Sequence, residues 1–219
     1  SDLSPRTLFD KIWDAHVVLS RGEQSLLYVD RHMVHDGSFH AFNMLHARGL
    51  KVRRPSQTFG VPDHYVPTHG RSAADAATPE IRRMIETLES NLEANGITRY
   101  ALDDERQGIV HVVGPEQGIT LPGLTLVCGD SHTSSHGALG AFSFGIGQSE
   151  NLHVLATQTL WQTRPRTMRI RVDGRLGVGA TPKDVALAII ARIGAGGAVG
   201  HVIEYAGEVF RAMSIEGRL

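Results

Sequence analysis

Apolar residues recur along the chain with two different spacings, and these spacings predict its helices and strands. Apolar residues three or four positions apart indicate a helix with one buried face, whereas short apolar runs between turn residues indicate buried strands. Thr78-Pro79 begins the clearest helix, and Asn95-Gly96 follows its end. The pattern predicts helices at 7–16, 39–47, 78–94, 151–160 and 181–193, and strands at 25–30, 124–128, 167–172 and 201–205.

The order of these elements predicts the fold class and the domain organisation. Strands alternate with helices, which is typical of α/β proteins. Residues 109–113 fit a helix or a strand, and residues 53–77 are expected to form a loop because Pro, Gly, His and Ser are frequent there. A new β-α-β pattern begins near Arg164-Pro165, so we predict two domains, residues 1–165 and 166–219.

Composition excludes several classes of protein. Of 219 residues, 41% are hydrophobic and 21% charged, and the net charge is −1, which argues against a nucleic-acid-binding surface. Residues 1–9 show no apolar segment or other signal-peptide pattern, and no apolar run is long enough to cross a membrane. A single cysteine, Cys128, excludes a disulfide within the chain and fits a reducing compartment. We therefore expect a cytoplasmic location and neither a nucleic-acid nor a membrane partner.

The segment from Gly129 to Thr133 directly follows the predicted strand 124–128. Loops at the carboxyl ends of strands are where α/β folds bind ligands. Asp130, Ser131 and His132 supply a carboxylate, a hydroxyl and an imidazole at consecutive positions, a set suited to acid–base chemistry or substrate binding. Taken alone, the same residues also fit an Asx-type turn that caps a helix.

Two other segments offer imidazoles beside candidate partners. Asp63 precedes His64 in a loop bounded by prolines, where the carboxylate either orients the imidazole or forms a solvated pair with it. His111 lies in the apolar run 108–113, so its ring needs a hydrogen-bond partner to offset desolvation. That partner is either a core group or a loop aspartate.

The spacing Asp30-x-His32-x-x-His35, with His40 nearby, is compatible with a divalent metal site. No equally clear fourth ligand follows these residues. Cys128 lies within a predicted strand and reads as a small buried hydrophobe rather than a nucleophile. The chain also lacks a dinucleotide-binding fingerprint, a Walker A sequence and a nucleophile elbow.

Together these segments match one family in order and spacing. The chain resembles aconitase-family hydro-lyases, and among them the large subunits of 3-isopropylmalate dehydratases. The strongest match is the stretch from Val127 to Ala138, which contains Gly129-Asp130-Ser131-His132-Thr133-Ser134-Ser135-His136. The other matching segments are 7–16, 28–35, 52–55, 108–116, 156–160 and 214–218.

The resemblance implies a three-layer α/β/α domain followed by the start of a second, similar domain. It also implies reversible dehydration and rehydration of a 2-hydroxy di- or tricarboxylic acid, with a [4Fe-4S] cluster as Lewis acid. In this family pattern, Asp63 and His64 protonate the departing hydroxyl, and His111 pairs with Asp130. Ser131 and His132 would contact the substrate carboxylate.

The chain also departs from the family pattern. Family members bind the cluster through three cysteines located downstream of the matching region, so the resemblance implies no metal ligand in this chain. A separate small subunit supplies the base that removes the α-proton. We therefore expect this chain alone to be incomplete and inactive, with exposed apolar surface and a tendency to self-associate.

A local departure concerns substrate choice. His40 stands where family members carry a glutamine expected to touch the substrate. The substrate implied by the family is 2-isopropylmalate or 3-isopropylmalate of leucine biosynthesis, and this change keeps methylmalate or homoaconitate open. A mononuclear metallohydrolase that uses Asp30, His32 and His35, and a non-catalytic module that binds carboxylates, are the two alternative functions.

Overall fold

The computed structural model describes residues 4–219, which divide into two compact units. The first unit runs to Gln162 without residues 22–24, and the second contains Gly22–Gln24 and Thr163–Leu219. Each unit is described by itself. The domain ranges 1–165 and 166–219 stay a prediction.

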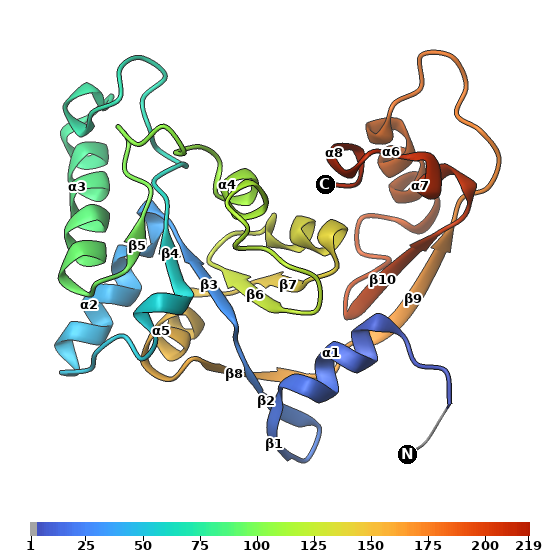
Figure 1. Cartoon of the computed structure of the whole chain (residues 1–219), viewed down its shortest axis with the longest axis horizontal. Helices are drawn as coiled ribbons and strands as arrows, with labels where there is room; N and C mark the ends of the chain where they lie inside the picture. The colour runs from blue at the N-terminus through green and yellow to red at the C-terminus, as the bar shows by residue number, and fades with distance from the viewer. Residues whose placement is uncertain (1–3) are drawn as a thin grey trace. The chain divides into compact units, whose positions relative to one another are not determined.

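The first unit contains two sheets and five α-helices among its described residues (Figure 1). Thr7 caps the first helix through a reciprocal bond with Asp10, and Thr78 caps the longest helix, which starts at Pro79. Its elements are α1 Leu8–His16, β1 Val17–Arg21, β2 Gln24–Tyr28, β3 Arg31–Val34, α2 Phe39–Ala47, β4 Thr58–Gly60, α3 Pro79–Ala94, β5 Thr98–Arg99, α4 Val110–Glu116, β6 Thr125–Cys128, β7 Phe142–Gly145, α5 Gln148–Thr157 and β8 Thr159–Thr163, with 3-10 turns at Asp36–Ser38, Pro55–Gln57, Ala73–Asp75 and Thr133–Leu139.

The larger sheet has five strands in the order β5-β4-β3-β6-β7, and all of its neighbouring strands are parallel. The chain moves outward from β3 through β4 to β5, and then returns to the other side of β3 with β6 and β7. The sheet therefore changes winding direction between β3 and β6. Ligands bind at such a switch point, outside the carboxyl ends of the strands.

Helices cover both faces of this sheet, which confirms the predicted α/β class and its three-layer arrangement. Successive residues of β3 point to opposite faces. Val34 packs with α2, α3 and α5 through residues such as Phe42, Leu88 and Leu155, whereas Met33 packs with Val113 of α4 on the opposite face. Strands β1, β2 and β8 form a separate three-stranded sheet.

Several elements differ from the sequence prediction. The segment at 109–113 lies mainly in helix α4, and α5 ends at Thr157, so that Thr159 begins strand β8 instead of continuing the helix. Gln158 between them adopts a positive φ of 59°, which ends the helix. Strand β4 lies inside the expected loop 53–77, because its three residues pair with β3 and β5.

A partly buried ion pair joins α1 to the larger sheet. His16 Nε2 lies 2.6 Å from Asp30 Oδ2, and Asp30 also accepts the Thr125 backbone N–H at 2.9 Å. The hydrogen bond to Asp30 raises the pKa of His16. Burial opposes ionisation of Asp30, but hydrogen bonds from His16 and Thr125 outweigh it and lower the pKa of the carboxyl group.

These shifts predict a pH-dependent contribution to stability. The raised pKa of His16 adds stability fully below about pH 6.5, which is lost as pH rises through the raised value. The lowered pKa of Asp30 adds stability above about pH 3.9, which is lost as pH falls through the lowered value. In urea unfolding, His16→Gln should cost about 1 to 3 kcal/mol at pH 5.5 and less at pH 8.5. An equal cost at both pH values would contradict this linkage.

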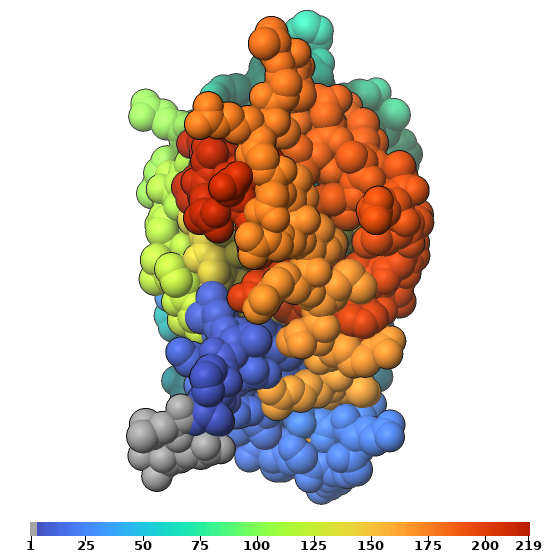
Figure 2. Space-filling view, turned by 90° about the vertical axis from the view of Figure 1, so that its right-hand side faces the viewer, coloured from blue at the N-terminus to red at the C-terminus, as the bar shows by residue number. Residues whose placement is uncertain are grey.

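The second unit is a β-α-β arrangement, with its surface in orange to red in Figure 2. Strands β9 Arg166–Arg171 and β10 His201–Ala206 pair in parallel, and α6 Pro182–Ile193 connects them. Helices α7 Glu208–Ala212 and α8 Ile215–Arg218 follow. Leu187 and Ile190 of α6 are about half exposed. Self-association through such apolar surface stays a prediction.

Candidate active site

Three loops carry the candidate site, and each follows a strand of the parallel sheet. His35 and Asp36 follow β3, Asp63 and His64 follow β4, and Asp130 follows β6. Because neighbouring parallel strands end at the same edge, these side chains meet at the switch point between β3 and β6. The candidate residues therefore come together although nearly 100 positions separate the first from the last.

Asp130 joins the two imidazoles that the sequence analysis selected. Its Oδ1 lies 2.6 Å from His111 Nε2, and its Oδ2 lies 2.8 Å from His64 Nε2. Asp63 pairs with the other ring nitrogen of His64. We call these four residues, Asp63, His64, Asp130 and His111, the Asp–His network.

Asp63 also fixes the start of helix α4. Its Oδ2 accepts the backbone N–H of Val110 at 2.8 Å, and Val110 is the first residue of that helix. Helix N-termini leave backbone N–H groups without partners inside the helix, so a carboxylate there is favourable. His111 is the next residue of α4, so one carboxylate positions His64 directly and His111 through the helix start.

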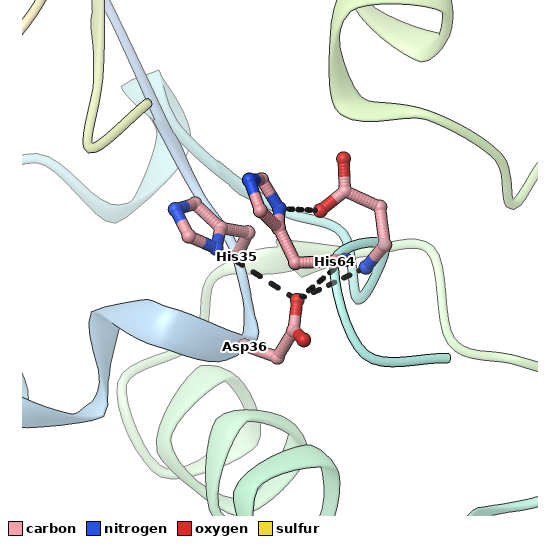
Figure 3. A group of neighbouring side chains, drawn as sticks. His35, Asp36 and His64 are labelled. Carbon is pink, nitrogen blue, oxygen red and sulfur yellow. Dashed lines mark hydrogen bonds and ion pairs between the residues drawn. The ribbon is translucent and has the colours of Figure 1, made fainter. Parts of the chain in front are cut away.

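Asp36 holds the backbone of the Asp63–Tyr65 turn (Figure 3). Its carboxylate accepts the backbone N–H groups of Asp63 and His64 at 3.1 Å and that of Tyr65 at 2.9 Å, and the side chain is fully buried. Burial opposes its ionisation, but the His35 ring, with Nδ1 3.7 Å from Oδ1, and the backbone N–H groups of the turn outweigh burial and lower the pKa of Asp36. The His35 ring stacks on His64, with ring centroids 4.1 Å apart.

The network favours a charged His64. Burial alone would lower the pKa of His64, but the hydrogen bonds and charges of Asp63 and Asp130 outweigh it and raise that pKa. For Asp130, hydrogen bonds from His111, the His132 backbone and His64 outweigh burial and hold the pKa well below its usual range. Both ring nitrogens of His64 face carboxylate oxygens, which only accept hydrogen bonds, so the site favours the imidazolium form. About a third of the side chain is exposed.

The three candidate substrate-binding residues lie in different surroundings. The backbone N–H of His132 donates to Asp130 Oδ1 at 2.7 Å, while its side chain is 83% exposed. Ser131 Oγ lies 3.3 Å from His132 Nδ1. Both side chains are exposed and lie next to the network. His40 is exposed on α2 with its ring over Phe39, and in the described part of the chain no hydrogen bond links it to the network. A substrate role for all three stays a prediction.

The structure contradicts the candidate metal site on Asp30, His32 and His35. Asp30 pairs with His16, whereas His32 is buried with its Nε2 2.8 Å from Asn151 Oδ1. Within residues 4–219, neither belongs to a group of convergent ligand atoms. The sequence spacing was misleading because Asp30 and His32 are each paired with a residue from another element, His16 of α1 and Asn151 of α5.

A different group, His35, Asp36, Asp63 and His64, does bring ligand atoms within 4.8 Å of one another. Every one of those atoms already has a hydrogen-bond partner in the protein. For example, His35 Nδ1 accepts the Gly37 N–H at 3.1 Å, and its Nε2 lies 3.1 Å from the Gly129 carbonyl oxygen. The group is therefore a hydrogen-bonded scaffold around His64 rather than an open metal site.

Sequence reasoning missed two residues that support the network. Asp36 was passed over because nothing in the sequence shows that the 63–65 turn lies against it. His136 occurs in the strongest matching stretch but received no role, although its Nε2 lies 2.9 Å from His111 Nδ1. A histidine in a Gly-rich stretch, beside a predicted ligand loop, was the available signal for it.

Comparison with known proteins identifies the family of the chain. The sequence model of the aconitase family (aconitate hydratase) matches residues 10–219. A curated 3-isopropylmalate dehydratase large subunit from Roseiflexus castenholzii is 55% identical over 222 aligned residues, which cover 98% of this chain and 47% of that protein. The chain thus spans about half the length of this relative. On this evidence the chain belongs to the aconitase family.

Proposed function

We propose that the protein containing this chain is a hydro-lyase that interconverts hydroxy acids by removing and re-adding water, as 3-isopropylmalate dehydratase does. The observation that carries the proposal is the imidazolium of His64, held between Asp63 and Asp130 and partly open to solvent. Hydroxide is a poor leaving group and needs a proton donor. A solvent-accessible imidazolium at the carboxyl edge of a parallel sheet meets that need.

In the proposed reaction, His64 gives its Nε2 proton to the hydroxyl that leaves. That proton is directed at Asp130 in the free protein, and a substrate hydroxyl would compete for it. Asp63 stays on the other ring nitrogen and keeps the ring oriented. In the reverse direction His64 takes the proton back, so water adds to the alkene and neither proton nor electron is gained or lost overall.

Ser131, His132 and His40 are the proposed contacts for substrate carboxylates. The exposed imidazole of His132 is free to turn toward a ligand while its backbone N–H stays on Asp130. His40 replaces the glutamine of the family pattern, so the size and shape of its ring would select among 2-hydroxy acids. We propose 2-isopropylmalate and 3-isopropylmalate as substrates, with methylmalate or homoaconitate as alternatives.

The family relationship implies a [4Fe-4S] cluster for the whole enzyme, but the residues of this chain do not suit it. Cys128 is fully buried in β6, and burial, together with the charges of Asp63 and Asp130, raises the pKa of its thiol. A cluster ligand must be a thiolate with access to iron. Cluster ligands would have to come from outside this chain.

The Roseiflexus relative is a large subunit, which supports a small-subunit partner for the whole enzyme. We propose that this partner supplies the base that removes the α-proton. Among the described residues, no helix is long and apolar enough to span a membrane.

The test is an assay of the full-length protein together with its small subunit, after anaerobic reconstitution with iron and sulfide. Dehydration of a 2-hydroxy di-acid creates a double bond conjugated to a carboxylate, which is followed by ultraviolet absorbance. We expect turnover of 2-isopropylmalate above that of methylmalate and homoaconitate. Stoichiometric zinc or manganese binding with hydrolase activity would instead support the metallohydrolase, and carboxylate binding without turnover would support the non-catalytic module.

A further inference from the structure

The Asp–His network continues inward beyond His111. His111 Nδ1 lies 2.9 Å from His136 Nε2, and His136 Nδ1 lies 2.7 Å from Thr120 Oγ1. His136 is fully buried and Thr120 is 3% exposed. Asp130, His111, His136 and Thr120 thus form one hydrogen-bonded chain that runs from the partly open site into the core.

The chemistry of these groups gives the chain a direction. An ionised carboxylate only accepts hydrogen bonds, so His111 Nε2 carries a proton and donates a hydrogen bond to Asp130 Oδ1. The Thr120 hydroxyl hydrogen has His136 Nδ1 as its only recorded acceptor among the described residues. If Thr120 donates to Nδ1, a neutral His136 must carry its proton on Nε2 and donate it to His111 Nδ1.

The opposite direction leaves a buried donor unpaired. If His111 Nδ1 carried a proton, His136 would have to accept it and turn its own N–H toward Thr120. The Thr120 hydroxyl hydrogen would then lose its acceptor inside the core, and an unpaired buried donor is destabilising. Burial is the main cause that lowers the pKa of His136 to about 4, which keeps this ring neutral near pH 7.

A glycine in helix α4 makes room for this arrangement. Glycine inside a helix is less favourable than alanine. At Gly114, a Cβ would lie 2.8 Å from both His136 Cε1 and Thr120 Oγ1, and 3.2 Å from Met33 Sδ. The helix that presents His111 thus accepts a weak helix former at the point where His136 and Thr120 contact it.

We propose that His136 is a positioning residue that holds His111 in one tautomer, with Nδ1 as acceptor and Nε2–H directed at Asp130. This role rests on the proposed function of the Asp–His network. With His136 in this role, the two imidazoles that contact Asp130 have different functions. His64, between two carboxylates, carries the transferable proton, and His111, backed by a neutral donor, orients Asp130 without competing as a second acid.

The decisive measurement is the tautomer of His111 in this chain, read at pH 8 from the ring-nitrogen shifts of a ¹⁵N-histidine-labelled sample and assigned with His111→Gln. Wild type should show a single Nε2–H tautomer for His111. His136→Leu, which removes the donor but fills the space, should give a mixture of both tautomers. His136→Gln retains an amide donor and should restore most of the Nε2–H form, which a merely structural role would not require.

His32→Leu is the matched control. His32 is equally buried, its pKa is likewise lowered to about 4 by burial, and its one recorded hydrogen bond goes to Asn151, outside the chain of donors. It should lose stability as His136→Leu does, yet leave the His111 tautomer unchanged. An unchanged tautomer in His136→Leu and His136→Gln, or the same mixture in His32→Leu, would overturn the proposal.

Turnover separates this proposal from the proposed function. In the full-length enzyme with its small subunit, His136→Leu should lower kcat about 10- to 100-fold, the usual cost of removing the group that orients a functional histidine, with little change in KM. Wild-type kcat in His136→Leu would overturn the positioning role. A wild-type enzyme without hydro-lyase activity would instead refute the proposed function, and the tautomer measurement would still decide the role of His136.

Discussion

Replacing His64 by glutamine should lower kcat of the full-length enzyme by about 10²- to 10⁴-fold, the contribution typical of a positioned general acid. Glutamine retains an N–H near Asp130 but cannot give up a proton. Because Asp36 holds the turn through backbone N–H groups, the loop should keep its shape in the variant. The expected result is a loss in kcat with a small change in KM, measured by alkene absorbance.

The pH profile gives an independent readout of the same role. An acid acts only while protonated, so wild-type kcat should fall as pH rises through the raised pKa of His64. That alkaline limb should disappear from the residual activity of His64→Gln. His46→Gln, an exposed histidine at the end of α2, should match wild type in both rate and profile. If His64→Gln retained wild-type kcat, His64 would not be the acid.

The local sequence was sufficient to select most of the Asp–His network. Asp130 follows a short apolar run, and strands of this kind in α/β folds end at ligand sites. Asp63 and His64 lie in a polar segment with prolines, and His111 in an apolar one where a partner was needed. The structure brings all four together. Their catalytic roles stay predictions, since the comparisons do not assign residues.

The supporting contacts depend on distant parts of the chain and left no local pattern. Strand β4 has three residues and exists because β3 and β5 lie on either side of it, so composition alone indicated a loop. Asp36 reads as an ordinary turn residue until the 63–65 turn is placed against it. The spacing of Asp30 and His32 wrongly suggested a metal site for the same reason. Their hydrogen-bond partners are His16 and Asn151, which are remote from one another in sequence.

Gly145, the last residue of β7, should be as sensitive as a residue of the network although it has no side chain. A Cβ at Gly145 would overlap the carbonyl oxygen of Asp130 and lie 3.2 Å from its carbonyl carbon. Gly145 is fixed against Cys128 in the β6–β7 pairing, so the Asp130 loop has to move. We expect Gly145→Ala to lower kcat about 100-fold, the effect of a displacement near 1 Å, and to cost about 1 to 3 kcal/mol in urea unfolding.

Gly137→Ala is the matched control, since Gly137 lies in the turn that follows the same loop and a Cβ there would meet nothing within 4 Å. It should leave kcat and the urea midpoint near wild type. The comparison tests whether the position of Asp130 limits the reaction, because both variants add one methyl group and only one of them pushes on that backbone. Equal kcat values for the two would mean that the Asp130 loop adapts without loss, and that the carboxylate bridging His64 and His111 need not be held where the structure places it.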